Sequence, residues 1–179
     1  MASPQLTPDQ IAEVSSLVAN YITVQWEKAL PLAVPLSPAQ RASMDGFFLP
    51  QVLDTRLLVL TESRVENPPF YVPLRRMGFT NLPSFSTMAA VTFCDVVVSH
   101  QPFSDGLLFH ELVHVEQYRQ LGNRRFAELY VRRFLSSGGY DGIPLEVNAY
   151  ELGGRFERSP HLGFSVEAEV TRWRVEDRF

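Results

Sequence analysis

The chain has 179 residues, with a hydrophobic fraction of 45% and a charged fraction of 20%, values typical of a folded globular protein. This composition excludes extensive disorder and fibrous repeats, and a chain of this length can bury about 70% of its unfolded surface. We therefore expect one domain spanning residues 1–179. The net charge of −4 predicts no general attraction to nucleic acid or acidic lipid.

The sequence also indicates where the protein works. Cys94 is the only cysteine, which excludes an intramolecular disulfide framework and fits a reducing compartment. The first residues hold no basic segment followed by an apolar one, so no secretory signal is expected. No apolar run approaches the roughly 20 residues that span a bilayer. These features predict a soluble, cytoplasmic protein with no membrane partner.

Two helix starts of the same kind are predicted in the first third of the chain. Residues 7–10 and 37–40 each begin with a hydroxyl side chain, followed by proline at the first helical position and glutamine at the third. After the first start, apolar residues recur every three or four positions, which predicts an amphipathic helix that ends at Pro31 and Pro35. The second helix should stop near Gly46.

The middle of the chain predicts strands separated by a long loop. Residues 56–60 are apolar and too few for a helix, which indicates a buried strand. Residues 61–87 contain four prolines and little periodicity, which is typical of a loop, and loops of this length are often functional. Residues 89–99 are β-branched and aromatic, and they predict either one strand or two short strands that turn at Cys94 and Asp95.

The last third of the chain is expected to be mostly helical. An apolar helix over residues 105–121 should be closed by Gly122, and an amphipathic helix over residues 123–135 should follow. Further expected elements are a loop at residues 136–139, a helix from Pro144 to about Glu157, and a last helix capped by Ser165. Helices around a small sheet, without regular alternation of strand and helix, indicate an α+β domain.

The strongest chemical signal is HELVH at residues 110–114, the H-E-x-x-H pattern of zinc hydrolases. On a helix, His110 and His114 lie about 40° apart and one turn from each other, so both imidazoles can reach one cation. Glu111 lies about 100° round from His110, where it is better placed to touch a water on the metal than to bind the metal itself. The neighbouring residues are apolar, which predicts a buried helix whose polar groups need partners.

Glu146 is the best third ligand in the sequence. Pro144 starts a helix that places Glu146 in its first turn, and Ala149 is small enough to let that helix approach closely. A catalytic zinc site generally has three protein ligands and one open position. We therefore expect His110, His114 and Glu146 to bind Zn²⁺. The alternative is a first-turn glutamate that is favoured by the helix dipole.

Other acidic and histidine residues are weaker candidates. Glu116 should face away from the two motif histidines, because it lies on the opposite side of the helix. Glu151 should lie about 140° from Glu146, so the two cannot both point at one site. His100 and His161 are isolated histidines, which are more often surface or core residues than ligands.

The segments HELVHVEQ and PLEVNAYE resemble the gluzincin group of zinc metallopeptidases, specifically its small bacterial members. The resemblance covers residues 107–151. It implies a mostly helical, zincin-like domain with a small β-sheet, in which the H-E-x-x-H motif lies on a buried central helix. It also implies that His110, His114 and Glu146 bind zinc and that Glu111 is the general base.

One feature of the group is missing from this sequence. Thermolysin-like members carry an aspartate four residues after the third ligand, which braces a histidine, whereas this chain has Tyr150 there. The bracing residue is therefore not identified. Asp141 could orient a ligand histidine, and Gln117, about 20° from His110 on the helix, could face the same cleft.

The resemblance implies a zinc metallopeptidase that hydrolyses a peptide bond of a peptide or protein substrate. Zinc activates the attacking water and polarises the scissile carbonyl, while Glu111 takes the proton and passes it to the leaving amine. The oxyanion needs a further donor, and the sequence does not rank Tyr140, Tyr150 and His100 for that role. The strand region 89–99 could pair with an extended peptide.

Alternative functions stay open at this point. One is a zinc hydrolase acting on a non-peptide substrate, and another is a metal-binding or interaction protein without catalysis. The intact Glu111 and the shortage of cysteine ligands favour catalysis. A cluster of arginines could bind nucleic acid, but a solvated helix face paired with Glu128 explains it at least as well. These are Arg119, Arg124, Arg125, Arg132 and Arg133.

Overall fold

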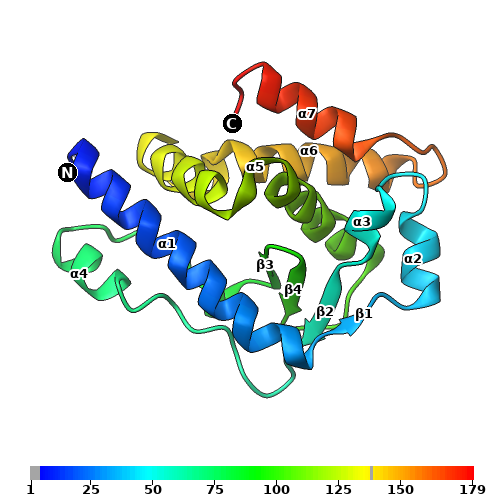
Figure 1. Cartoon of the computed structure of the whole chain (residues 1–179), viewed down its shortest axis with the longest axis horizontal. Helices are drawn as coiled ribbons and strands as arrows, with labels where there is room; N and C mark the ends of the chain where they lie inside the picture. The colour runs from blue at the N-terminus through cyan, green and yellow to red at the C-terminus, as the bar shows by residue number, and fades with distance from the viewer. Residues whose placement is uncertain (1–4, 138) are drawn as a thin grey trace.

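Helices surround a small mixed sheet in the computed structural model, which describes residues 5–137 and 139–179 (Figure 1). The predicted α+β class is confirmed. The helices are α1 (Pro8–Ala29), α2 (Pro38–Met44), α3 (Pro50–Leu53), α4 (Tyr71–Arg76), α5 (Asp105–Ser137), α6 (Pro144–Arg158) and α7 (Val166–Val175). The strands are β1 (Val34–Pro35), β2 (Arg56–Val59), β3 (Ala90–Phe93) and β4 (Val96–Ser99).

The predicted helix starts are confirmed by their capping hydrogen bonds. Before α1, the Thr7 hydroxyl accepts a bond from the Gln10 backbone N–H at 3.3 Å, and the Gln10 side chain accepts one from the Thr7 N–H at 2.9 Å. Ser37 and Gln40 form the same reciprocal pair before α2. These bonds satisfy N–H groups that a helix leaves without partners at its first turn. Ser165 caps α7 as expected.

The sheet has the strand order β1-β2-β4-β3, so β3 is an edge strand. β2 and β4 run parallel, while the β1–β2 and β3–β4 pairs are antiparallel. The two-strand alternative for residues 89–99 is the right one, because the chain reverses at Cys94 and Asp95. Cys94 adopts a φ of 57° there, and its partly buried side chain packs against the core.

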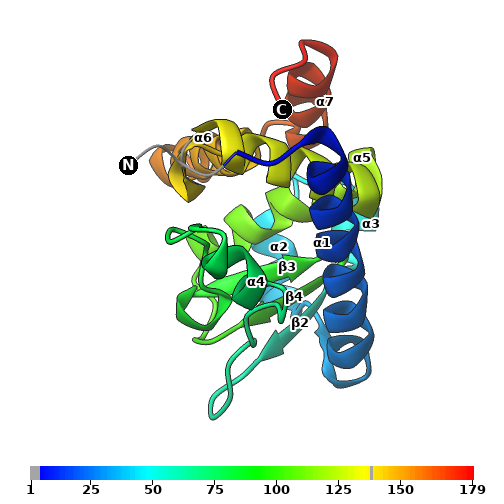
Figure 2. The same ribbon diagram turned by 90° about the vertical axis from the view of Figure 1, so that its left-hand side faces the viewer.

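Helix α5 is the central element of the fold. It packs against α1, α6, α7 and β3, and Figure 2 shows α1 beside the sheet with α6 above it. The helix breaks at Gly122, where φ is 74°, as the sequence predicted. Glycine tolerates this left-handed conformation because it has no Cβ. The second half continues to Ser137, so the loop expected from residue 136 begins later, and residue 138 lies outside the described part.

The prediction of an unstructured loop over residues 61–87 is wrong in part. The segment contains α4 and a 3-10 turn at Phe85–Thr87. Pro73 falls in the first turn of α4, where a missing N–H costs no helical hydrogen bond. Tyr71 and Leu74 of α4 form a small apolar cluster with Phe79. Prolines therefore suggested a loop where short-range packing supports a helix.

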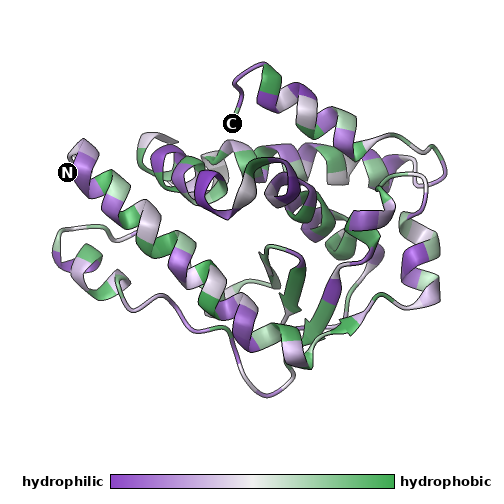
Figure 3. Ribbon diagram, viewed as in Figure 1, coloured by the Kyte–Doolittle hydropathy of each residue, from purple (hydrophilic) through white to green (hydrophobic). Residues whose placement is uncertain are grey.

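The main core lies between the sheet and the first half of α5. Figure 3 colours β4 almost wholly as hydrophobic, and all four of its residues are buried. Phe109 of α5 stacks on Phe156 of α6 with ring centroids 4.4 Å apart, and it also contacts Phe47. This apolar packing holds α5 and α6 side by side. Among the described helices, none combines the length and apolar character needed to cross a membrane.

Candidate metal centre

Two packed helices bring the three predicted ligand residues together. His110 and His114 lie one turn apart on α5, and Glu146 lies in the first turn of α6, which begins at Pro144. Ala149, on the same helix as Glu146, is fully buried and leaves room for a close approach. The three side chains form the group of potential metal ligands found among the described residues.

The distances between the ligand atoms suit a zinc ion. The His110 and His114 Nε2 atoms are 3.1 Å apart, and Glu146 Oε2 lies 3.5 Å from the first and 3.3 Å from the second. Ligands held tetrahedrally at about 2.0–2.1 Å from a zinc ion lie about 3.3–3.4 Å from one another. The side chains are therefore already spaced as three corners of a zinc tetrahedron.

The burial of the cluster points to a missing partner. Glu146 is 4% exposed and His114 is 6% exposed. Within the described residues, the buried Oε2 atom of Glu146 has no hydrogen-bond partner of good geometry. A buried carboxylate oxygen without a partner is costly, and a cation between the three side chains would remove that cost.

The electrostatics of the metal-free cluster agree with this interpretation. Burial lowers the pKa of His114, but the charge and hydrogen bonding of Glu146 outweigh burial and raise that pKa to about 9. Burial likewise raises the pKa of Glu146, but the imidazoles of His114 and His110 hold it well below its usual range. In the metal-free chain, a proton on His114 therefore balances the charge of Glu146, and binding of a metal ion would release this proton.

Gln117 is the residue that braces His114. Its Oε1 accepts a hydrogen bond from His114 Nδ1 at 2.8 Å, and its Nε2 donates to the Leu145 carbonyl and to Asn148 Oδ1, both at 2.9 Å. Because an amide oxygen only accepts, His114 Nδ1 donates the proton of this bond, which leaves Nε2 as the ring atom that faces Glu146 and could bind a metal. Gln117 therefore fixes the tautomer of His114 and also ties α5 to α6.

Helical periodicity indicated that Gln117 could face the cleft, but it did not predict this bracing role. The available signal was its position three residues after His114, which puts both side chains on one helix face. The side chain of Asp141, the other candidate for this role, lies outside the described part of the structure. The ring of Tyr150, four residues after Glu146, lies 4.6 Å from the His110 ring, and the residue is 59% exposed.

Glu111 is held in place by the edge strand. Its Oε2 accepts a hydrogen bond from the Thr92 hydroxyl of β3 at 2.6 Å, and both residues are buried. Glu111 lines the same cavities as His110 and is not among the grouped ligand atoms. Glu111 thus lies beside the group of His110, His114 and Glu146 and is held by Thr92. Thr92 gave no signal in the sequence, because its contact joins β3 to α5.

Two cavities meet at the cluster. An open groove of about 480 Å³ runs past the start of β3, the start of α5 and the glycines of α6. A smaller inner cavity of about 90 Å³ extends toward α1. His110, Glu111 and Tyr140 line both of them. Burial, followed by the charge and hydrogen bonding of Glu146, raises the pKa of the Tyr140 phenol, which therefore keeps its proton.

The weaker candidates lie outside the cluster. His100 is buried and bridges the Val65 N–H at 3.0 Å and the Met88 carbonyl at 2.7 Å, so it holds the 61–87 segment against the strands. Glu151 and His161 are exposed. All three therefore lie outside the group formed by His110, His114 and Glu146.

Glu116 faces away from the histidines, as predicted, and has a structural role. It is almost fully buried and accepts two hydrogen bonds from Arg119, at 2.7 and 2.8 Å, and one from Gln120. Arg119 in turn bonds Glu167 of α7. This network fastens α7 to α5 on the side away from the groove.

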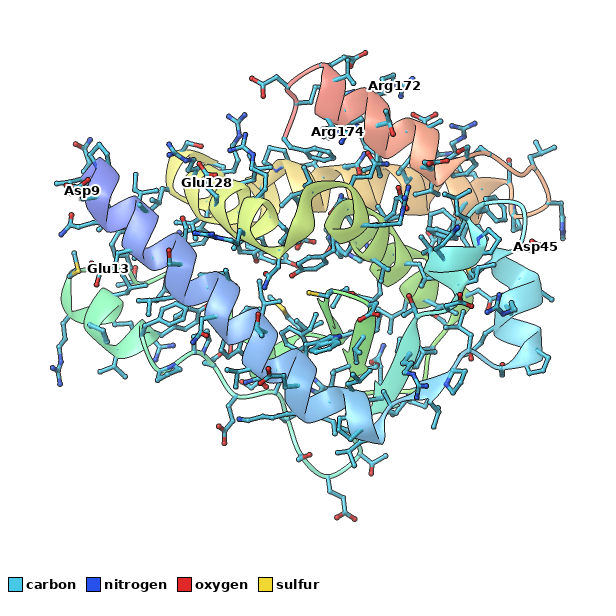
Figure 4. The ribbon with its side chains drawn as sticks, in the orientation of Figure 1. Asp9, Glu13, Asp45, Glu128, Arg172 and Arg174 are labelled. Carbon is cyan, nitrogen blue, oxygen red and sulfur yellow. The ribbon has the colours of Figure 1, made fainter. Side chains whose placement is uncertain are left out.

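Ion pairs within the chain occupy several of the clustered arginines. Arg125 and Arg132 both pair with Glu128, which Figure 4 labels on the second half of α5. Arg133 donates to the Phe179 carbonyl. These contacts favour the interpretation of a solvated, internally paired helix face.

No protein-family model, curated protein or solved structure matches the chain.

Proposed function

We propose that the protein is a zinc-dependent metallopeptidase of the gluzincin kind. The observation that carries this proposal is the spacing of 3.1–3.5 Å among the ligand atoms of His110, His114 and Glu146. That spacing suits tetrahedral zinc, and the buried carboxylate oxygen has no other partner among the described residues. A bound zinc ion would supply Lewis-acid chemistry, acidifying water and polarising a carbonyl.

Glu111 is the general base in this proposal. The Thr92 hydroxyl donates a hydrogen bond to Glu111 Oε2, and the Glu111 carboxylate lines the groove where a substrate would lie. From this position Glu111 takes a proton from the attacking water and later delivers it to the leaving amine. A purely structural metal site would have no use for this buried carboxylate, which supports catalysis over a silent site.

Tyr140 is the best donor for the oxyanion among the three residues that the sequence left unranked. It lines both cavities beside Glu146, and its phenol is protonated. Both ring nitrogens of His100 already form hydrogen bonds, to the Val65 N–H and the Met88 carbonyl. The ring of Tyr150 packs against the ring of His110. A positioned phenol stabilises the charge that develops on the carbonyl oxygen.

The edge strand supports a peptide as the substrate. β3 pairs with β4 on one side, and the residues around its start, from Met88 to Ala90, line the groove. An extended peptide in the groove can add to such an edge through main-chain hydrogen bonds. A non-peptide substrate would make no use of this strand.

The proposal is tested by zinc content and by hydrolysis. We expect about one zinc per chain in the parent, as for a single three-ligand site. His110→Ala and Glu146→Ala should lose it, while the exposed controls His161→Ala and Glu151→Ala should keep it. Zinc that stays bound in Glu146→Ala, or a parent that takes up no zinc, would refute the ligand set.

Hydrolysis is then measured by mass spectrometry on a mixed peptide library. The zinc-loaded parent should cleave peptides, and Glu111→Gln should keep its zinc but lose about 10²–10⁴-fold in rate. Zinc binding without cleavage of any peptide would contradict a peptidase and favour one of the alternatives, a non-peptide hydrolase or a silent metal site.

A further inference from the structure

The inner cavity is the least explained feature next to the candidate centre. Its volume is about 90 Å³, and its wall includes Val18 and Ile22 of α1, Phe85, and Phe93 of β3. Protein interiors are normally packed like organic crystals, with few voids larger than a water molecule. A void of this size, opening onto the ligand residues, therefore marks a place that a ligand can fill.

The wall of this cavity is apolar except near the metal cluster. Apart from tyrosines, the ionisable side chains in its wall are those of the cluster and its neighbour, namely His110, Glu111, His114 and Glu146. The remaining wall consists mainly of aliphatic and aromatic side chains. Away from the cluster, a charged group entering the cavity would lose its hydration without gaining a charged partner, whereas an apolar group would gain burial.

Two tyrosines of α5 add a weakly polar element. Tyr118 and Tyr130 line the cavity, and burial raises the pKa of both phenols, which therefore keep their protons. Phenol hydroxyls can donate to a water molecule or to the weakly accepting sulfur of a thioether. They therefore tolerate an aliphatic or methionine-like occupant but offer nothing to neutralise a charge.

We propose that the inner cavity binds one aliphatic side chain of the substrate, of leucine or methionine size, next to the bond that is cleaved. This inference rests on the proposed peptidase function. The cavity meets the groove at His110 and Glu111, so a side chain inside it places its own backbone beside the reacting groups. A peptide lying along β3 presents alternate side chains to one side, and one of them would enter the cavity.

The size of the cavity sets the selectivity. An apolar protein cavity of about 150 Å³ holds a benzene ring. At about 90 Å³ the inner cavity is smaller, which favours an aliphatic side chain over an indole ring. A glycine would leave it empty. Since one methylene in an apolar pocket changes selectivity by roughly 10-fold or more, leucine should be preferred strongly over glycine.

The first test measures binding without hydrolysis. N-acetyl-leucine amide and N-acetyl-glycine amide are titrated into the zinc-loaded protein, and binding is followed by NMR chemical shifts. Val18→Phe fills the cavity, and Val24→Phe makes the same change on the exposed side of α1. We expect the leucine amide to bind the parent and Val24→Phe equally, and Val18→Phe roughly 10-fold more weakly.

A second variant changes the cavity in the opposite direction. Phe85→Ala removes an aromatic ring from the wall, so N-acetyl-phenylalanine amide should bind this variant better than it binds the parent. This gain does not depend on whether Val18→Phe folds. Thermal melting of each variant shows which of them keep their native structure.

The outcomes separate this inference from the proposed function. Equal binding of leucine and glycine amides to the parent would overturn the inference, as would unchanged leucine binding in a folded Val18→Phe together with no gain in Phe85→Ala. Cleavage of library peptides, measured on the same samples, reports separately on the peptidase. An active enzyme without aliphatic preference would refute the cavity assignment alone.

Discussion

The two halves of α5 use their polar side chains in opposite ways. Before Gly122, the helix buries Glu111, His114, Glu116 and Gln117, and each has a partner or a proposed ligand. After Gly122, the polar side chains are mainly surface residues that pair along the helix itself, as Glu128 does. The buried half thus depends on other elements of the fold, whereas the exposed half depends mostly on its own sequence.

This difference has an energetic reason. A buried polar group that loses its partner costs the full penalty of its desolvation, whereas an exposed ion pair is screened by water. Changes in the first half of α5 should therefore affect stability and the site strongly. Changes in the second half should have small effects.

The largest effect on stability is expected at Phe109, which lies in the first half. Phe109→Ala should reduce the free energy of unfolding by about 3–5 kcal/mol, because it leaves a cavity among fully buried aromatic rings. Val175→Ala, at a side chain that is 75% exposed, is the control and should have little effect. Urea unfolding measures both. A loss below about 1 kcal/mol at Phe109 would contradict a rigid core at this position.

The next effect tests the link between α5 and α6. Gln117→Ala should weaken zinc binding about 10–100-fold, because His114 loses the acceptor that fixes its tautomer. Gln51→Ala, at an exposed glutamine on α3, should bind zinc like the parent. Competition with a chelator gives the affinities. If both variants bind equally, Gln117 does not position the ligand.

A smaller effect is expected where β3 contacts α5. Thr92→Val removes the hydroxyl that holds Glu111 Oε2, so kcat should fall about 10-fold while zinc content stays the same. Thr80→Val changes an exposed threonine in the same way and should not alter kcat. Rates are compared on one peptide substrate that the parent cleaves. An unchanged kcat in Thr92→Val would show that Glu111 needs no support from β3.

The smallest effect is expected in the second half of α5. Hydrogen bonds from Arg125, and then Arg132, lower the pKa of Glu128. A lowered pKa in the folded state adds stability above the ordinary value of 4.5, and this stability is lost as the pH falls below it. Glu128→Ala should therefore cost less than about 1 kcal/mol near neutral pH and still less in acid. Urea unfolding near neutral pH and in acid measures the loss of unfolding free energy, with the exposed Glu13→Ala as the control. A larger loss in acid than at neutral pH would contradict a lowered pKa of Glu128.

Local signals accounted for much of the secondary structure. Reciprocal capping at Thr7 and Ser37, the break at Gly122 and the helix start at Pro144 all depend on residues that are neighbours in the chain. α4 was missed because the prolines around it obscured a short apolar pattern. β1 was missed because its two residues form a strand only by pairing with β2.

The candidate site also has features that follow from local sequence and features that depend on tertiary packing. The pairing of His110 with His114, and the separate position of Glu111, follow from helical periodicity within five residues of sequence. The sequence also pointed to Glu146, but only the packing of α6 on α5 decided that its carboxylate lies within 3.5 Å of both imidazoles. Contacts at Thr92, and the inner cavity beside α1, depend on residues far apart in the chain. Sequence alone determined which groups repeat along one helix, whereas tertiary structure decided which groups from different elements meet, because only folding brings them within reach.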